Sequence, residues 1–209
     1  MRQLLKYILL LLIAGSNPFS LFSQQTQGEY SLLRSLAAKR TNAGNTFHKR
    51  FAELNRTVCL AVPAGLFITG LLEKDKTLKE NALFITESIL VSSLSTWTLK
   101  KIVRRERPAV NDPSFVAVTD DHDFSFPSGH TSLAFSMATS LSIKYRKWYI
   151  VVPAFLYAGF NGYSRLYLGV HYPTDVLAGA ITGSSSAWLT FKLNQWLHRK
   201  KKNKAAAAL

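Results

Sequence analysis

The chain has 209 residues, enough for one domain, and its 26 Lys and Arg residues outweigh 12 Asp and Glu residues to give a net charge of +14. Such a charge suits a nucleic-acid partner, but much of the basic excess lies at the ends of apolar segments, which argues against a disordered nucleic-acid-binding tail. The single cysteine, Cys59, excludes an internal disulfide.

Residues 1–23 predict either a secretory signal peptide or a first membrane helix. The segment starts with Arg2 and Lys6, continues through an apolar stretch from Tyr7 to Ala14, and ends in polar residues. This order of basic, apolar and polar parts is typical of a signal peptide. If the segment is retained, it supplies an additional membrane helix, and both alternatives are open at this point.

The following segment, residues 24–57, is polar and basic, with apolar residues such as Leu32, Leu33 and Leu36 at helical spacing. This pattern predicts an amphipathic helix lying on the outer surface of a membrane. An ordinary solvated segment is the alternative.

Residues 58–198 predict the membrane domain. A helix needs about 20 apolar residues to cross about 30 Å of hydrocarbon, and most of the apolar segments approach that length. Ser, Thr and Gly are frequent within them, which allows close helix packing in lipid. We therefore expect an all-α bundle with five or six membrane helices, whose apolar segments cover about 55–72, 78–99, 131–143, 148–169 and 174–197.

The basic residues between these segments predict the orientation of the bundle. Alternate crossings place residues 73–80, residues 144–147 and the basic tail 199–209 on one side, and Lys-rich loops mark the cytoplasm. The other side is then exterior, which in a bacterium is the periplasm beyond the inner membrane. Residues 100–107 are basic although exterior, so we expect an anionic ligand there. The terminal residues 205–209 resemble a vector-derived addition.

The first chemical motif contains Lys100, Arg107 and Pro108. If the preceding helix continues until Pro108 stops it, the two cations lie on one face, two turns apart. An ammonium and a planar guanidinium together suit a phosphate group. A belt that binds lipid headgroups is the alternative interpretation, and it fits Lys101 and Arg105 better.

The second motif is Pro127-Ser128-Gly129-His130, directly before an apolar run. The backbone amides of Ser128, Gly129 and His130 are therefore expected at a helix N-terminus, where unpaired N–H groups and the helix dipole bind anions. His130 can donate a proton to a departing alkoxide, and a solvent-facing capping histidine is the alternative.

The third motif runs from Ser164 and Arg165 to His171 and Asp175. Pro173 favours the first turn of a helix, which puts Asp175 near the third helical position. Its carboxylate can then orient the imidazole of His171 and stabilise the cation that forms when the other ring nitrogen attacks phosphorus. A capping carboxylate beside an interfacial histidine is the alternative.

An acidic cluster, residues 120–123, lies between the first two motifs. Its carboxylates and one imidazole are of the types that bind metals, but an acidic exterior loop that contributes to a lid is the favoured interpretation.

The three motifs, in this order and at these spacings, resemble the signature of the type 2 phosphatidic acid phosphatase superfamily, which includes lipid phosphatases and vanadium haloperoxidases. The resemblance implies that His171 is a nucleophile forming a phosphohistidine, that His130 is the acid for the leaving group, and that Asp175 orients the nucleophile. It also implies a phosphate site without metal or cofactor, formed by Lys100, Arg107, Ser128, Gly129 and Arg165, with Ser164 left open.

We therefore expect a membrane-embedded lipid phosphatase without nucleic-acid or obligatory protein partners. Its expected substrate is a phosphomonoester or pyrophosphate of a lipid, such as a lipid A phosphate, undecaprenyl pyrophosphate, phosphatidylglycerol phosphate or phosphatidic acid. A vanadate-dependent haloperoxidase and a non-catalytic binder or transporter of lipid headgroups are the alternatives.

Overall fold

The computed structural model describes residues 27–206, and within that range the regular structure is entirely helical. The predicted all-α fold is confirmed, whereas the signal peptide or first helix predicted over residues 1–23 lies outside the described residues. The helices are α3 (Gln27–Ala38), α4 (Asn42–Leu72), α5 (Lys76–Val103), α6 (Pro108–Asn111), α7 (Gly129–Tyr145), α8 (Trp148–Tyr167) and α9 (Pro173–Ala206).

Local capping chemistry fixes where the two longest N-terminal helices begin. The side chain of Thr41 accepts a hydrogen bond from the backbone N–H of Gly44, and that of Asp75 accepts two at the start of α5. The predicted segment 24–57 therefore contains α3 and the first half of α4, and the predicted division after residue 57 falls inside one continuous helix. No breaker interrupts α4 at that point.

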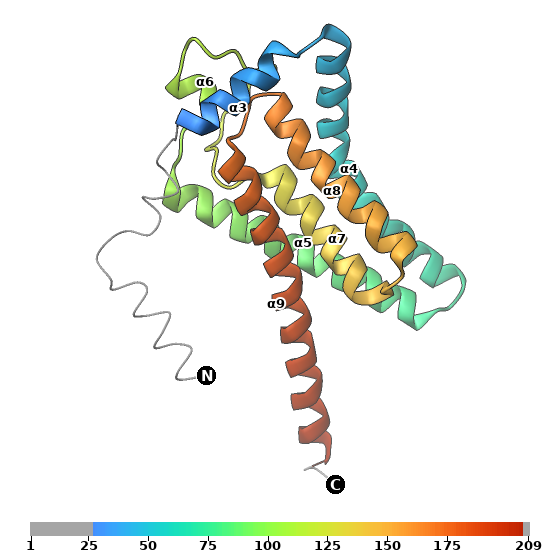
Figure 1. Ribbon diagram of the computed structural model, residues 1–209. Coiled ribbons are helices and arrows are strands. Elements are labelled where there is room, and N and C mark those ends of the chain that lie inside the picture. The colour runs from blue at the N-terminus through green and yellow to red at the C-terminus, as the bar shows by residue number, and fades with distance from the viewer. Residues whose placement is uncertain (1–26, 207–209) are drawn as a thin grey trace.

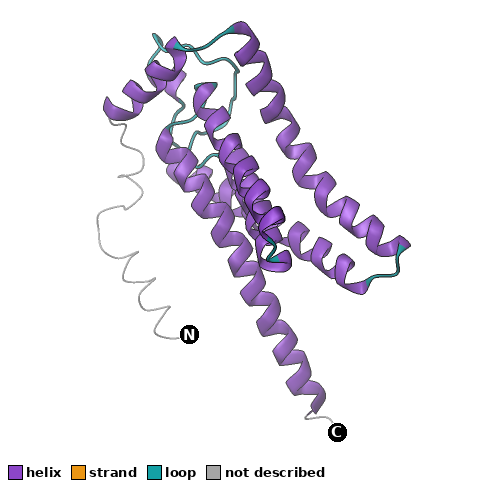
Figure 2. Ribbon diagram, turned by 45° about the vertical axis from the view of Figure 1, so that its right-hand side comes forward, coloured by secondary structure: helices purple, strands orange, loops and turns teal. Residues whose placement is uncertain are grey.

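Helices α4, α5, α7, α8 and α9 form a bundle in which α7 packs against α5, α8 and α9 (Figure 1). The last turns of α9 extend well beyond the other helices (Figure 2). Helices α3 and α6 lie across the opposite end of the bundle, where the loops carrying the motifs gather. Close contact between α7 and α9 requires Gly179, because a Cβ atom there would lie 2.6 Å from the carbonyl oxygen of Ser128.

The interior of the bundle contains buried hydroxyl side chains, whereas large apolar side chains are exposed on its surface. The hydroxyl of Ser132 on α7 lies 2.6 Å from that of Ser92 and 2.9 Å from that of Thr96, both on α5. Leu94 and Trp97, on the same α5, are largely exposed. Since water would favour the reverse arrangement, this distribution indicates that the outer surface contacts lipid.

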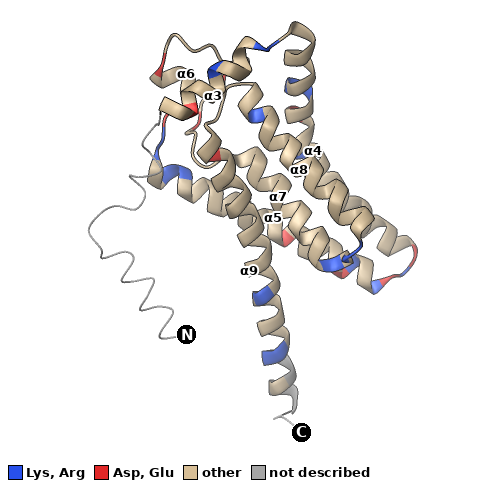
Figure 3. Cartoon of the chain, in the orientation of Figure 1, with Lys and Arg blue, Asp and Glu red and all other residues tan. Residues whose placement is uncertain are grey.

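Within the described part of the chain, two stretches are long and apolar enough to cross a membrane, namely α4 and the stretch from Lys76 that contains α5. The number of five or six membrane helices stays a prediction. The turn after α4, which carries both basic and acidic residues, and the basic turn after α7 lie toward the end of the bundle from which α9 projects, away from the motif loops (Figure 3). Successive loops thus lie at opposite ends of the bundle, as the sequence led us to expect.

Candidate functional site

The three motifs meet in one cavity of about 510 Å³ at the loop-rich end of the bundle. Lys100 enters it from the last turn of α5, Gly129 and His130 from the first turn of α7, and His171 from the loop before α9. Arg107 completes the cationic part of the wall. Ser128, Arg165 and Asp175 are buried next to this wall without lining the cavity itself.

Lys100 and Arg107 converge by a different route from the one expected. Helix α5 ends at Val103, and Arg104 follows in the left-handed conformation with φ at 50°. The expectation of one helix continuing to Pro108 is therefore wrong, and Pro108 instead begins α6. The two cations meet because both bind the loop before α7: Lys100 donates to the carbonyl oxygen of Phe124, and Arg107 to that of Asp123.

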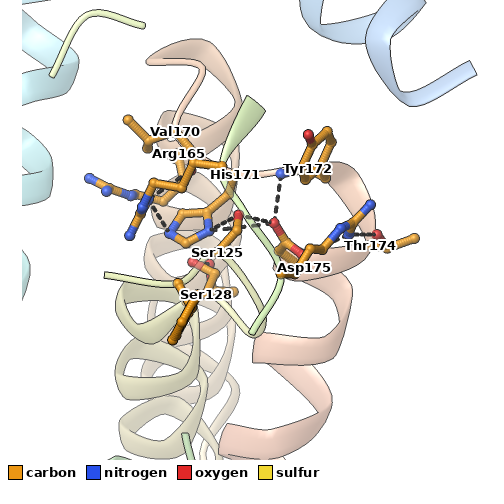
Figure 4. Close-up of polar contacts among 12 residues, drawn as sticks. Ser125, Ser128, Arg165, Val170, His171, Tyr172, Thr174 and Asp175 are labelled. Carbon is orange, nitrogen blue, oxygen red and sulfur yellow. Dashed lines mark hydrogen bonds and ion pairs between the residues drawn. The ribbon is translucent and has the colours of Figure 1, made fainter. Parts of the chain in front are cut away.

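The imidazole of His171 is almost completely buried, and its two nitrogens face different partners (Figure 4). Its Nε2 atom lies 3.4 Å from Nη1 of Arg107, and its Nδ1 atom lies 3.3 Å from the hydroxyl of Ser125. Because a guanidinium can only donate, Nε2 is the acceptor and Nδ1 carries the proton. The lone pair of Nε2 therefore points to the cationic side.

Asp175 lies behind His171, as the third residue of α9. Its Oδ2 atom is 3.6 Å from Nδ1 of His171 and accepts hydrogen bonds from the hydroxyl of Ser125 and the backbone N–H of Tyr172. Ser125 thus accepts from His171 and donates to Asp175. No motif in our sequence analysis included Ser125, although it lies only three residues before Ser128.

The interpretation of Arg105 as part of a lipid-headgroup belt is wrong, because its side chain is buried. It donates to Asp175 Oδ1 at 2.7 Å and to Glu29 of α3 at 2.7 Å, and its guanidinium lies 4.0 Å from the centre of the Tyr172 ring. Glu29 also accepts a hydrogen bond of 2.6 Å from the hydroxyl of Thr174. This buried network connects α3 to the start of α9 behind His171.

On the other side of His171, the acidic loop meets the predicted phosphate-binding cations. Asp123 lies 3.2 Å from Lys100 and also pairs with Arg107, and Asp121 pairs with Arg165 and lies 3.2 Å from Arg107. Within residues 27–206, no three His, Cys, Asp or Glu side chains are placed to hold a metal ion. The carboxylates of Asp121 and Asp123 therefore contact the cations that the sequence analysis predicted to bind phosphate.

Burial and the surrounding cations shift the protonation of the site. Burial, reinforced by Arg107, holds the pKa of His171 well below its usual value. Burial, reinforced by Arg165, lowers the pKa of His130 to about 4. Burial alone would raise the pKa of Asp123, but Lys100 and Arg107 outweigh it and keep that pKa below the ordinary value. Near neutral pH both imidazoles are uncharged, and a phosphate anion beside them would raise their pKa values.

The serines of the motifs have partners within the fold. Ser128 precedes α7, but its hydroxyl accepts a hydrogen bond of 2.9 Å from Thr131 instead of capping the helix. Ser164 donates to the carbonyl oxygen of Phe160 and lies 2.9 Å from Nδ1 of His48, outside the cavity lining. The helix N-terminus predicted at Gly129 is confirmed.

The sequence matches known proteins most clearly over the bundle. A model of the PAP2 superfamily matches residues 81–199. The lipid A 4'-phosphatase of Bacteroides thetaiotaomicron is 44% identical over 68 residues, which cover 32% of this chain and 30% of the relative. The undecaprenyl-diphosphatase of Sulfolobus acidocaldarius is 30% identical over 126 residues, or 59% of each chain. These matches span less than two thirds of either relative's length.

Solved structures extend the likeness over more of the chain. The crystal structure of Aquifex aeolicus LpxE has a TM-score of 0.68 and 32% identity, and the match covers 78% of this chain and 94% of that one. A transmembrane PAP2-type phosphatidylglycerolphosphate phosphatase from Bacillus subtilis has a TM-score of 0.65 at 22% identity, covering 92% and 94%. A bacterial vanadium-dependent iodoperoxidase has a TM-score of 0.56 at 16% identity, covering 79% and 48%. The likenesses to the Bacillus subtilis phosphatase and to the iodoperoxidase concern the fold alone.

Proposed function

This chain belongs to the PAP2 superfamily, and we propose that it is a membrane enzyme that hydrolyses a phosphomonoester or pyrophosphate of a lipid. The observation that carries the proposal is the environment of His171. Its Nε2 atom faces Arg107, and its Nδ1 atom is backed by Ser125 and Asp175. An imidazole held in this tautomer, beside cations and next to apolar helix faces, suits nucleophilic attack on a lipid phosphate.

The proposed reaction has two steps. Nε2 of His171 attacks phosphorus, the bond from phosphorus to the lipid oxygen breaks, and the leaving oxygen takes a proton from His130. A water molecule then attacks the phosphohistidine, releases inorganic phosphate and returns a proton to His130. Asp175 stabilises the positive charge that develops on the His171 ring in the first step.

Lys100, Arg107 and Arg165 are proposed to hold the phosphoryl oxygens. Phosphoryl transfer depends mainly on positioning and on stabilisation of negative charge, which fixed cations and the N-terminal amides of α7 can supply. Nε of Arg165 is buried beside the cavity wall and lacks a hydrogen-bond partner in the described part of the chain, so this residue has a donor that no protein group uses. An incoming phosphate would displace the carboxylates of Asp121 and Asp123. This chemistry requires no metal.

We further propose that the enzyme spans the bacterial inner membrane several times, with the cavity opening to the periplasm. The Lys and Arg residues in the turns on the other side of the bundle support this orientation, because Lys and Arg favour the cytoplasmic side whatever acidic residues accompany them. The apolar exposed faces of α4 and α5 favour a lipid phosphatase over a soluble haloperoxidase with the same fold.

The test is phosphate release by the purified protein from a panel of phosphorylated lipids in detergent micelles, with and without a chelator. We expect release from at least one lipid, no effect of the chelator, and loss of release in His171→Ala. His198→Ala is the matched control, because His198 is exposed on the distant part of α9. No release from any lipid, or full release by His171→Ala, would overturn the proposal.

A further inference from the structure

The cavity has a cationic end and a more apolar wall. Lys100 and Arg107 form the cationic end, beside His130 and His171, whereas Trp97 and Leu133 line the wall between α5 and α7. Trp97 is one turn before Lys100 in α5, and Leu133 is one turn after Gly129 in α7, so both lie toward the middle of the bundle. A lipid with its phosphate at the cationic end would therefore extend along this wall.

A further cation, Arg56, lines the same cavity from α4. Its neighbour Asn55 is buried and donates a hydrogen bond of 3.0 Å to the backbone oxygen of His130, which fixes this turn of α4 against the start of α7. Asn55 is held in turn by the hydroxyl of Tyr157 at 3.2 Å. The position of Arg56 beside His130 is therefore built into the packing of three helices.

Arg56 differs from the other cations near the cavity in its partners. Lys100, Arg107 and Arg165 each pair with a carboxylate of the acidic loop. Over residues 27–206, Arg56 forms no ion pair or hydrogen bond through its side chain. Its charge also disfavours protonation of His130, which is consistent with their closeness. A cation that lines a binding cavity without an internal counter-charge is available to an anionic ligand.

The side of the cavity on which Arg56 lies indicates which part of a substrate it meets. In the proposed reaction, His130 serves the leaving oxygen, and the leaving group is the lipid. The first atoms of the leaving group therefore lie near His130, and Arg56 lines the cavity from the turn of α4 that is held against His130. In a lipid monophosphate these atoms are alcohol carbons, whereas in a lipid diphosphate they form a second phosphate.

We infer that Arg56 binds the inner phosphate of a lipid diphosphate and gives the enzyme a preference for diphosphates over monophosphates of the same lipid. The inference rests on the proposed function. Nε2 of His171 bonds to the terminal phosphorus, and the bond from that phosphorus to the bridging oxygen breaks. The electron pair of this bond leaves with the lipid monophosphate, whose negative charge Arg56 neutralises. Water then cleaves the phosphohistidine to inorganic phosphate.

The experiment compares farnesyl diphosphate with farnesyl monophosphate in mixed micelles, using wild type, Arg56→Gln, Arg56→Lys and Arg50→Gln. Arg50 is the matched control, because it is an exposed arginine of the same helix that does not line the cavity. The ratio of the two kcat/KM values is measured on one preparation of each variant, so that differences in the amount of folded enzyme cancel.

We expect Arg56→Gln to lower the ratio of diphosphate to monophosphate activity by about 10- to 100-fold, as for loss of a hydrogen bond to a charged group. Arg56→Lys should retain part of the preference, and Arg50→Gln should keep the wild-type ratio. An unchanged ratio in Arg56→Gln, or an equal change in Arg50→Gln, would overturn the inference and leave the phosphatase function standing. A wild type that releases phosphate from another lipid of the panel but not from farnesyl diphosphate would also overturn the inference alone.

Discussion

Arg105 and Arg107 lie on opposite sides of His171 and differ in the burial of the carboxylates with which they pair. This difference, and not the burial of the arginines themselves, distinguishes their roles. Arg105 and Arg107 are both buried, with side chains 1% and 7% exposed. Arg105 pairs with Glu29 and Asp175, which are 7% and 0% exposed, whereas Arg107 pairs with Asp121 and Asp123, which are 30% and 62% exposed. One network is closed and the other reaches solvent.

The difference has a physical consequence for exchange of partners. Removing one member of a buried pair leaves an uncompensated charge, so the network of Arg105 holds its geometry. A more exposed carboxylate instead regains its hydration when it turns into water, and an incoming phosphate replaces it as the counter-charge of the buried Arg107. The closed network therefore positions the nucleophile, and the open one can exchange its carboxylates for a phosphate.

The largest effect is expected for Asp175→Asn, which alters the closed network where it touches His171. An amide at this position removes the negative charge that stabilises the charged ring. Its NH₂ group also favours the wrong tautomer of His171, in which Nδ1 is the acceptor and Nε2 carries the proton. We expect a loss of about 10⁴-fold in kcat, by analogy with the corresponding change in serine-protease triads. Single-turnover measurements of phosphate release test this loss in rate. A loss below about tenfold would show that Asp175 does not stabilise the charged ring of His171.

The closed network also shows where sequence analysis reached its limit. The helices, the helix start at Gly129 and the place of Asp175 in the first turn of α9 were predictable, because they depend on local patterns. The buried position of Arg105 could not be predicted, because it depends on contact with Glu29, which is distant in sequence and belongs to α3. The end of α5 at Val103 was also missed, since Arg104 adopts a left-handed conformation usually marked by glycine.

The next effect separates the two arginines directly. Arg105→Gln removes a buried counter-charge that contacts both Glu29 and Asp175, so we expect the free energy of unfolding to fall by about 3–5 kcal/mol. Arg107→Gln should destabilise the fold less, while kcat falls by about 10²- to 10³-fold. Thermal unfolding in detergent and phosphate release, measured on both variants, test this. Equal destabilisation would contradict the distinction between the closed and open networks.

A smaller effect is expected from the pH dependence of stability. The unfolded chain binds a proton on each histidine near pH 6.5, but burial first, and then Arg107, keep the pKa of His171 well below that value in the fold. Stability should therefore fall by up to about 1.4 kcal/mol for each pH unit below 6.5, until the folded pKa is reached. His171→Gln should flatten the decrease in melting temperature between about pH 6.5 and about pH 5. Parallel curves for both proteins would argue against a buried neutral imidazole.

The smallest effect is expected for Asp123→Asn, which weakens the open network. A phosphate would no longer compete with this carboxylate for Lys100 and Arg107, so KM should fall by about fivefold, the equivalent of about 1 kcal/mol. Asp120→Asn is the control, because Asp120 also lines the cavity but forms no ion pair within the described range. Steady-state kinetics on the preferred lipid distinguish them. A rise in KM would show that Asp123 binds substrate and does not compete with it.

The central claim, that Nε2 of His171 becomes covalently bound to phosphorus, is tested most directly by trapping the intermediate. Enzyme mixed with a lipid diphosphate carrying ³²P in its terminal phosphate is quenched in alkali within the first turnover. We expect acid-labile, base-stable label on the protein, located at His171 by peptide mapping and absent from His171→Ala. Rapid turnover by wild type without any labelled protein, or label on another residue, would contradict the account.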